Sequence, residues 1–401
     1  MFSAATTPPK FFTLILMSGL SVMSLNMFLP SLANMAESFN TDYALVSISI
    51  AGYLGVTATL QLILGPLSDR YGRRPVVLCG IAVFTCASVV CFLSTSIEVF
   101  LIFRMLQGSV SAGIALSSPI VRDTTPANEA ASKIGYLAMG WAVAPMIAPM
   151  LGGVLDEQFG WRSNFMFFTL AGIIVLIICW FDLGETNQQR SSSFSEQFRS
   201  YPDLFRSRRF WGYALCATFS VGTFFIFIVG APLIAQEHLD LSAAQLGFFI
   251  GSITIGFIFG NFLSGRYASR FALTTMMITG RIVAIAGLCA GLFLFSLGYV
   301  NEWTVFGTTI FSGIGNGLTS PSTNSGVLSV RPKLAGSASG LSGAILVGGG
   351  ALLSSLSGSV ITAFTSVYAL HVLMLISAAI GLIAAWYVLY VDKQMAQLEA
   401  A

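Results

Sequence analysis

The segment "GPLSDRYGRR" at residues 65–74 places four charged side chains between two long apolar runs. The runs lie near residues 44–66 and 75–96, and neither contains a charged residue. An α-helix needs about 20 predominantly apolar residues to cross a bilayer. The segment therefore predicts a short charged connection between two membrane-spanning helices.

The whole chain has the composition of an integral membrane protein. Of its 401 residues, 55% are hydrophobic and 9% are charged, whereas a soluble domain carries about 25% charged residues. Because the surface of a large soluble protein must be wet, a soluble fold is excluded. The net charge of +2 gives no indication of nucleic-acid binding, and the nucleotide-binding sequence G-x-x-x-x-G-K is absent, so no cofactor is expected.

Charged and turn-rich stretches divide the chain into twelve apolar runs. They lie near residues 11–32, 44–66, 75–96, 98–120, 131–155, 162–183, 210–235, 242–264, 272–296, 303–323, 335–362 and 366–390. The expected fold class is therefore an all-α membrane protein with twelve transmembrane helices in two six-helix bundles. The expected domains are an N-terminal bundle (1–184), a cytoplasmic linker (185–209) and a C-terminal bundle (210–401).

Lysine and arginine residues gather on one side of the predicted membrane. If the N-terminus is cytoplasmic, 16 of the 19 lie on that side. Arg162 lies on the outer side, and Arg104 and Arg281 lie within spans. Cytoplasmic loops carry an excess of these residues. Both termini are therefore expected in the cytoplasm, and the membrane is expected to be a bacterial inner membrane.

The 17 acidic residues avoid the predicted membrane core. Nine lie on the cytoplasmic side, and eight lie in outer loops or at outer helix ends, among them Asp156 and Glu157. An ionisable residue within a span is a functional candidate by default. The sequence therefore places no carboxylate inside the bilayer that could carry a proton.

Two segments of the first half return in the second half. "SDRYGRR" (68–74) corresponds to "SGRYASR" (264–270) at an offset of 196 residues, and "GIALSSP" (113–119) resembles "GNGLTSP" (315–321). Two matches in corresponding spans indicate a duplicated six-span unit, so the two bundles are expected to be pseudo-symmetric. Such repeats are typical of secondary transporters, in which substrate binds near the midplane between halves that rock around it.

Residues 65–74 resemble the cytoplasmic signature of the major facilitator superfamily. Glycines there permit a tight turn and close helix approach, and the charged residues can form charge-assisted bonds that hold one conformation. The residues expected to form this conformational lock are Gly65, Asp69, Arg70, Gly72, Arg73, Arg122 and Asp123. The alternative is a solvated basic loop that only satisfies the charge asymmetry.

Spans four and five carry two further resemblances. "LIFRMLQGSVSAG" (101–113) is similar to the span-four motif of the superfamily, with Arg104 inside the membrane. "GWAVAPMIAPMLGG" (140–153) resembles the antiporter motif of exporters, although Ala148 replaces the usual glycine. Small residues and prolines allow tight packing and a kink. The residues of this motif are Pro145, Pro149, Gly152 and Gly153.

"NMFLP" (26–30) and "VRDTTP" (121–126) resemble the bicyclomycin/chloramphenicol-resistance branch of the twelve-span drug:proton antiporters. That branch usually carries an aspartate at the position of Asn26, and the resemblance implies that this acid carries the coupling proton and attracts cationic drugs. An asparagine cannot ionise. Coupling is therefore left open between His371, a cytoplasmic-end carboxylate such as Asp123, the substrate itself, and no coupling at all.

Polar and aromatic residues within the spans are the candidates for substrate binding or coupling. They are Asn26, Tyr53, Arg104, Phe224, Phe227, Arg281 and His371. Asn26 and Arg104 each lie six residues from the outer end of their spans and share a depth, so a contact between them is expected. The sequence leaves open whether the three aromatic residues line a cavity or face lipid.

The four polar candidates also have purely structural interpretations. Arg104 is then a donor to backbone carbonyls, and Arg281 extends its long stem inward and packs against other helices. His371 is then a hydrogen-bonded packing residue. Asn26 is then a cap for a carbonyl that Pro30 leaves free.

The expected function is secondary active export of small molecules, drugs or metabolites, by alternating access, with proton coupling implied by the resemblance. Buried arginines without a fixed carboxylate favour an anionic or neutral substrate. The alternative is an exporter of an anionic metabolite or siderophore, or a uniporter, that is not coupled through a span-one carboxylate. An enzyme is disfavoured because His238 and His371 lie near no catalytic cluster, and a channel because a duplicated half suits a carrier. The expected partners are substrate, protons and the lipid bilayer, with the chain as a monomer that binds no metal.

Overall fold

The computed structural model describes residues 7–187, 202–267, 270–331 and 335–400. Within these ranges the chain is helical apart from its connections, and no strand is present. It forms two compact units: unit 1 is Met1–Glu196 with Ser242–Gly247, and unit 2 is Gln197–Leu241 with Phe248–Ala401. The expected domain boundaries at 184 and 210 stay a prediction.

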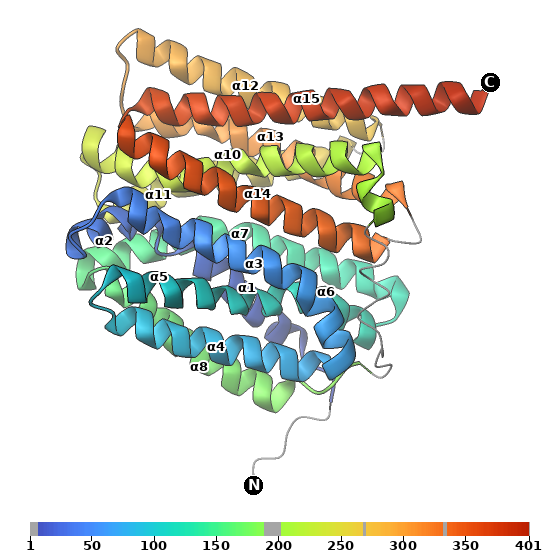
Figure 1. Cartoon of the computed structure of the whole chain (residues 1–401), viewed down its shortest axis with the longest axis horizontal. Coiled ribbons are helices and arrows are strands. Elements are labelled where there is room, and N and C mark those ends of the chain that lie inside the picture. The colour runs from blue at the N-terminus through green and yellow to red at the C-terminus, as the bar shows by residue number, and fades with distance from the viewer. Residues whose placement is uncertain (1–6, 188–201, 268–269, 332–334, 401) are drawn as a thin grey trace. The chain divides into compact units, whose positions relative to one another are not determined.

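Unit 1 consists of six spans, two of which are interrupted (Figure 1). The first is α1 (Phe11–Asn26), the 3₁₀ turn η1 (Leu29–Ser31) and α2 (Leu32–Ser38). The fourth is α5 (Ile97–Leu106), the 3₁₀ turn η2 (Gln107–Val110) and α6 (Ser111–Thr124). The others are α3 (Tyr43–Tyr71), α4 (Arg73–Leu93), α7 (Ala127–Phe159) and α8 (Arg162–Asp182).

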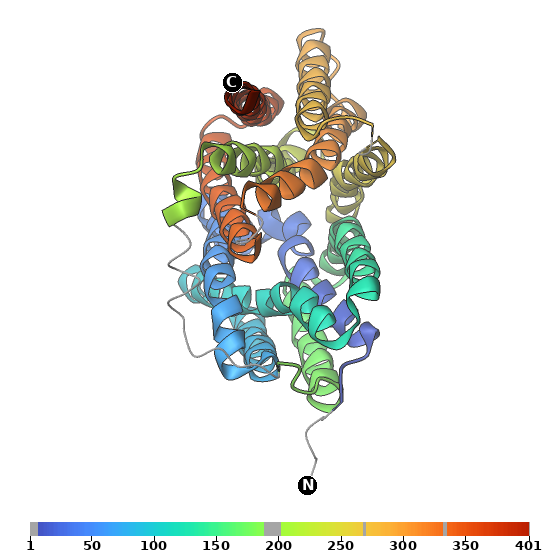
Figure 2. The same cartoon turned by 90° about the vertical axis from the view of Figure 1, so that its right-hand side faces the viewer.

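Unit 2 contains long helices without such interruptions. They are α10 (Arg208–His238), α11 (Ala243–Tyr267), α12 (Leu273–Ser296), α13 (Glu302–Val330), α14 (Ala335–Ala363) and α15 (Val367–Ala400). The first residues of α11 belong to unit 1. Within unit 2, α12 packs against α13 and α15, and α10 packs against α14 and α15; Figure 2 shows these helices close to end-on.

Each of the twelve predicted runs coincides with one of these helices or with an interrupted pair. Ten of them are long and apolar enough to cross a membrane when only the described residues are considered. The two outside that set are α7 and α13, of which α13 is rich in serine, threonine and glycine. The all-helical membrane fold predicted from the sequence is confirmed.

The charged segment at 65–74 differs from the expected connection. It is almost entirely helical, because α3 continues to Tyr71 and α4 begins at Arg73. Gly72 alone makes the turn, with φ of 103°, a backbone conformation that only glycine adopts without strain. The charged side chains therefore project from two helix ends whose positions are fixed by a single residue.

Aromatic side chains fill the core of each unit. In unit 1, Phe165 lies in edge-to-face contact with Phe100, Phe168 and Trp161, with ring centroids 5.2 to 5.9 Å apart. In unit 2, Phe306 stacks on Phe249 at 5.1 Å. Such pairs contribute stability beyond their area of burial, so each unit has an apolar core of its own around which the polar side chains are arranged.

Candidate functional site

Both interrupted spans of unit 1 break where the sequence predicted site residues. Asn26 is the last residue of α1, and Arg104 lies in the last turn of α5. Pro30 lacks an N–H group and so cannot continue the helical bonding of span one. Discontinuous helices present unpaired backbone groups at the binding sites of many transporters. The two breaks therefore mark one candidate site within unit 1.

Arg104 is fully buried and joins the two interrupted spans. Its Nη2 donates to the Ser24 carbonyl oxygen at 2.7 Å, and its Nη1 donates to Gln107 Oε1 at 2.6 Å. Its guanidinium carbon lies 4.3 Å from the centre of the Phe28 ring and 4.4 Å from that of Tyr53. Aromatic faces and neutral acceptors partly offset the cost of burying the charge. In the described part of the chain Arg104 pairs with no carboxylate, and its Nε has no acceptor.

Asn26 does not meet Arg104 as expected. Its Nδ2 donates to the Val22 carbonyl of its own helix at 2.8 Å, and its Oδ1 is buried without a hydrogen-bond partner. The expected cap is also wrong, because Pro30 would free the carbonyl of residue 26 rather than that of Val22. Asn26 is therefore held by its own helix and contributes no bond to the second span.

The Arg104 network extends to α4 through residues that the sequence reasoning did not single out as site residues. Gln107 Nε2 donates to Ser88 Oγ at 2.7 Å, and the Tyr53 hydroxyl donates to the Ser21 carbonyl at 3.4 Å. The three-residue spacing of Arg104 and Gln107 on one helix was a usable signal. Ser88 gave none, because a serine in an apolar span is common.

Arg281 is the buried arginine of unit 2, and it packs against a neighbouring helix. The side chain on α12 has no exposed area. Its Nη2 donates to Asn316 Oδ1 at 2.7 Å, and its Nε donates to Thr319 Oγ1 at 3.2 Å. Asn316 is in turn bonded to Ser220 at 3.0 Å and to Thr223 at 3.1 Å. The terminal Nη1 of Arg281 is buried and has no acceptor.

The two acceptors of Arg281 come from "GNGLTSP" (315–321), which the sequence marked only as an internal repeat. Both lie on α13, three residues apart and thus on one face of the helix. In the described residues no carboxylate pairs with Arg281. This unit therefore also holds a positive charge among neutral oxygen atoms.

His371 on α15 is fully buried and bonded at both ring nitrogens. Its Nε2 lies 3.1 Å from Thr308 Oγ1, and its Nδ1 lies 3.2 Å from the Val367 carbonyl. Its ring packs edge-to-face on Phe295 with centroids 4.7 Å apart. These contacts fit the structural interpretation of His371 as a packing residue.

The aromatic candidates on α10 divide into two kinds. Phe227 is fully buried and packs edge-to-face on Phe306 at 6.0 Å, so it belongs to the core of unit 2 and does not face lipid. Phe224 is half-exposed and contacts its neighbour Phe225 at 6.0 Å. Of the two, only Phe224 presents part of its ring outside the core.

Two of the predicted lock residues, Asp69 and Asp123, pair with a third, Arg73. Its Nη1 lies 2.7 Å from Asp69 Oδ1, and its Nε lies 3.2 Å from Asp123 Oδ2 at the end of α6. Its backbone N–H donates to Glu185 Oε1 at 2.9 Å, just beyond α8. Arg73 therefore bonds to three helix ends. Glu185 was missed because it follows the span in a stretch assigned to the linker.

The remaining lock residues have different surroundings. A Cβ at Gly72 would meet the carboxylate of Glu185 and displace that side chain, and the positive φ already requires glycine there. The Gly65 carbonyl accepts from Ser68 Oγ at 2.8 Å. The Arg70 guanidinium lies over the Tyr71 ring at 5.4 Å, and the side chain of Arg122 is exposed.

The residues of the antiporter motif lie within α7, which continues through both prolines. Pro149 is buried and Pro145 is half-buried. Gly152 and Gly153 are also buried, and a Cβ at Gly152 would lie 1.7 Å from the Met27 carbonyl oxygen. The glycine therefore allows α7 to pack directly on the backbone break of span one.

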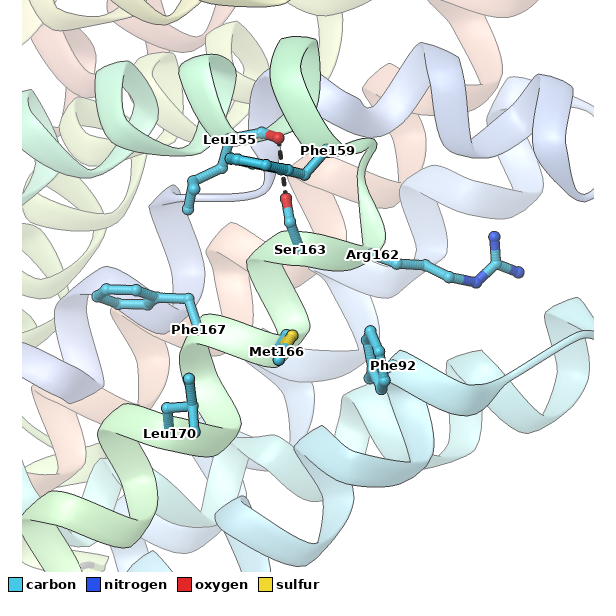
Figure 3. A pocket seen from close by; sticks show the side chains of 8 residues that line it. All are labelled: Phe92, Leu155, Phe159, Arg162, Ser163, Met166, Phe167 and Leu170. Atoms are coloured by element: carbon cyan, nitrogen blue, oxygen red, sulfur yellow. Dashed lines mark hydrogen bonds between the residues drawn. The ribbon is translucent and has the colours of Figure 1, made fainter.

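A cavity of about 340 Å³ opens elsewhere in unit 1, between α4, α7 and α8 (Figure 3). Its wall is apolar apart from Arg162 and Ser163, and Phe159, Met166 and Leu170 are exposed there. It contains none of the predicted site residues. An exposed apolar hollow on a membrane protein suits lipid chains, so we do not assign it to substrate.

Comparison with known proteins agrees with the resemblance inferred from the sequence. The pattern of the Major Facilitator Superfamily matches residues 14–354. The uncharacterized MFS-type transporter YdgK of Bacillus subtilis is 32% identical over 68% of this chain and 71% of its own length. Multidrug resistance protein D of Escherichia coli is 29% identical, and a bicyclomycin resistance protein homolog of Haemophilus influenzae is 25% identical, each over 86% of this chain and 87% of its own length.

Solved structures share the fold. A bacterial homolog of the human lysosomal transporter Spinster, in an inward-facing and occupied conformation, has a TM-score of 0.77 at 18% identity over 97% of this chain and 98% of its own. The peptide transporter POT in complex with sulfate also has a TM-score of 0.77, at 14% identity over 97% and 96% of the two chains. At this identity the likeness establishes the fold alone.

Proposed function

The chain belongs to the Major Facilitator Superfamily, and from that premise we propose that it exports small anionic or neutral molecules by alternating access in exchange for protons. Relatives named for bicyclomycin, chloramphenicol and multidrug resistance support export of drug-like compounds. The substrate of this chain would bind within the spans, as is typical of such carriers.

The observation that carries the proposed substrate charge is the pair of buried arginines. Arg104 and Arg281 are both 0% exposed, and both bond only to neutral oxygen atoms. Removing an uncompensated charge from water costs several kcal/mol. An anionic substrate group that approaches either guanidinium reduces this cost, whereas a cation increases it.

The second candidate is a carrier without proton coupling. It is favoured by Asn26, which cannot ionise and whose amide bonds only to its own helix. Such a protein would be a uniporter, or an exporter of an anionic metabolite or siderophore that follows its own gradient. The buried, doubly bonded His371 gives no support to proton transfer through that residue.

The charge asymmetry supports a bacterial inner-membrane location with both termini in the cytoplasm. In that orientation the Arg73 contacts lie on the cytoplasmic side. Ion pairs that connect three helix ends would stabilise one of the two access states and break in the other. A monomer in the lipid bilayer is sufficient for this cycle.

A resistance and accumulation screen tests the proposal. Cells that lack their own exporters would express the chain and receive chloramphenicol (neutral), carboxyfluorescein (anionic) or ethidium (cationic), with and without a protonophore. We expect reduced accumulation of the first two compounds and loss of that effect with the protonophore. Strong export of ethidium alone would overturn the proposed substrate class, and export that ignores the protonophore would favour the uniporter.

A further inference from the structure

Asp156 is the one buried acidic side chain in the described parts of the chain, with 5% of its surface exposed. It lies near the C-terminal end of α7, at the end of unit 1 opposite the Arg73 contacts. The sequence placed it at an outer helix end and gave it no role. A carboxyl group buried on the motif helix of a transporter that lacks a span-one acid needs an explanation.

The partners of Asp156 are neutral. Asn34 Nδ2 donates to its Oδ2 at 2.8 Å, and the Ser31 hydroxyl also bonds to the carboxylate. None of the ion pairs formed by the described residues includes Asp156. A buried carboxylate without a cation takes up a proton more readily than an exposed one.

The charged groups on the surrounding elements do not change this. Glu157, the next residue on α7, and Glu37 on α2 are exposed and negative. Arg162 at the start of α8 donates through Nη2 to the Ser94 carbonyl at 3.0 Å and lies over the Trp161 ring. The helix α1 carries no charged residue. Among the described residues of these elements, no cation therefore holds Asp156 in its ionised form.

The same contacts connect Asp156 to the break in span one. Ser31 belongs to η1, and its Oγ accepts from Asn164 Nδ2 on α8 at 3.2 Å. Asn164 Nδ2 also lies 3.3 Å from the Gly152 carbonyl, one turn before Asp156. Figure 3 shows the Ser163 hydroxyl bonded to the Leu155 carbonyl, which joins the end of α7 to α8 at 3.0 Å. A change in the protonation of Asp156 therefore affects hydrogen bonds that connect spans one, five and six.

We propose that the Asp156 carboxyl binds and releases the proton that is exchanged for substrate, an inference that rests on the proton coupling of the proposed function. The ionised carboxylate accepts bonds from Ser31 and Asn34. Once it has taken up a proton, one of its oxygens becomes an O–H donor and only the other remains a good acceptor, so the bonds from Ser31 and Asn34 must be redistributed. The proton thereby changes the connection between α7 and the break in span one, where the helices of unit 1 are least continuous.

The position of Asp156 gives the proton a short route. Asn34 is exposed, so the carboxyl lies one side chain away from the surface at this end of the unit. Burial raises the pKa of Asp156, which lies just beyond the predicted span 131–155; Glu157 adds to this rise and the bonds from Ser31 and Asn34 oppose it. The carboxyl therefore exchanges its proton at a higher pH than an ordinary aspartate.

Infrared spectroscopy of the purified, substrate-free protein tests proton binding directly. We expect a protonated-carboxyl C=O band that disappears as the pH rises above the ordinary aspartate range. The band should be missing from Asp156→Asn and retained in Glu157→Gln, the matched exposed neighbour. A wild-type band that persists unchanged in Asp156→Asn would overturn the proposal.

Transport in liposomes tests coupling, with chloramphenicol and carboxyfluorescein as probes. We expect proton-driven accumulation of the probe by Asp156→Asn to be at least tenfold lower than that by the wild type. The variant should still exchange labelled for unlabelled probe, which also shows that it is folded. Asp156→Glu should keep accumulation with a displaced pH profile. Wild-type accumulation in Asp156→Asn would overturn this inference alone. Exchange without proton-driven accumulation in the wild type would overturn the coupling itself and this inference with it, while leaving export intact.

Discussion

Unit 1 and unit 2 bury one arginine each and hold it in different ways. Arg104 lies between two aromatic rings at helix breaks, and both of its terminal nitrogens are bonded. Arg281 lies between continuous helices, and its terminal Nη1 has no acceptor. Each arginine has one donor without an acceptor, Nε in Arg104 and the terminal Nη1 in Arg281. We therefore expect Arg104 mainly to connect spans one and four, and Arg281 to offer its terminal nitrogen to an anionic group.

The largest effect on binding is expected at Arg281. Arg281→Met should weaken binding of carboxyfluorescein about 10- to 100-fold, because a hydrogen bond to a charged group contributes about 1.5–3 kcal/mol and about 1.4 kcal/mol is tenfold. Arg281→Lys should recover part of the lost affinity. Fluorescence titration of the purified variants with carboxyfluorescein measures the affinity. A larger loss of affinity in Arg104→Met than in Arg281→Met would reverse the comparison.

Arg104 should matter more for stability. Arg104→Met leaves the Ser24 carbonyl and Gln107 Oε1 without their donor, at about 1–3 kcal/mol. That corresponds to a melting temperature lower by about 3–10 °C for a unit of this size. Arg281→Met should lower the stability less. Asn316 Oδ1 still accepts from the Ser220 hydroxyl, and the Thr319 hydroxyl still donates to the Gly315 carbonyl. Thermal unfolding in detergent checks the order, and Ser24→Ala is the control because its hydroxyl bond is long, at 3.4 Å.

A smaller difference is expected between the two copies of the charged segment. The second copy has Gly265 and Ser269 at the positions of Asp69 and Arg73, so it lacks both partners of the ion pair. Arg73→Gln should slow transport about threefold to tenfold, because a partly exposed network contributes about 1 kcal/mol. Arg270→Gln, at an exposed arginine of the second copy, should change it little. Equal effects would indicate that both segments act only as basic loops.

The smallest effect is expected at Asn26. Asn26→Ala removes one bond to the Val22 carbonyl and a buried oxygen that has no partner, so transport should change less than about threefold. Asn26→Asp is the sharper variant, because it restores an acid at the position where related exporters are expected to carry one. We expect it to gain ethidium export in the accumulation assay. Complete inactivation by Asn26→Ala would show that this residue acts in coupling after all.

The surroundings of Asn26 and Arg104 show which features of a span can be predicted from the sequence. The sequence predicted that Asn26 and Arg104 share a depth and meet, but Arg104 contacts Ser24 and Phe28 instead. Residues four apart share a face of a helix, and the residue midway between them faces away. Depth follows from counting residues along a span, whereas contact depends on the rotation of each helix, which packing decides.

The sequence by itself determined the membrane fold, the helices and the buried arginines. Its apolar runs are long enough to span, and charged residues are too costly in hydrocarbon to occur there without a role. Only the tertiary structure decided the partners of those residues. In the folded chain Arg281 donates to Asn316, and Arg73 donates to Glu185. Asp156, which the sequence had placed at an outer helix end, is buried. Burial depends on what other helices cover, and no pattern within a single helix records that.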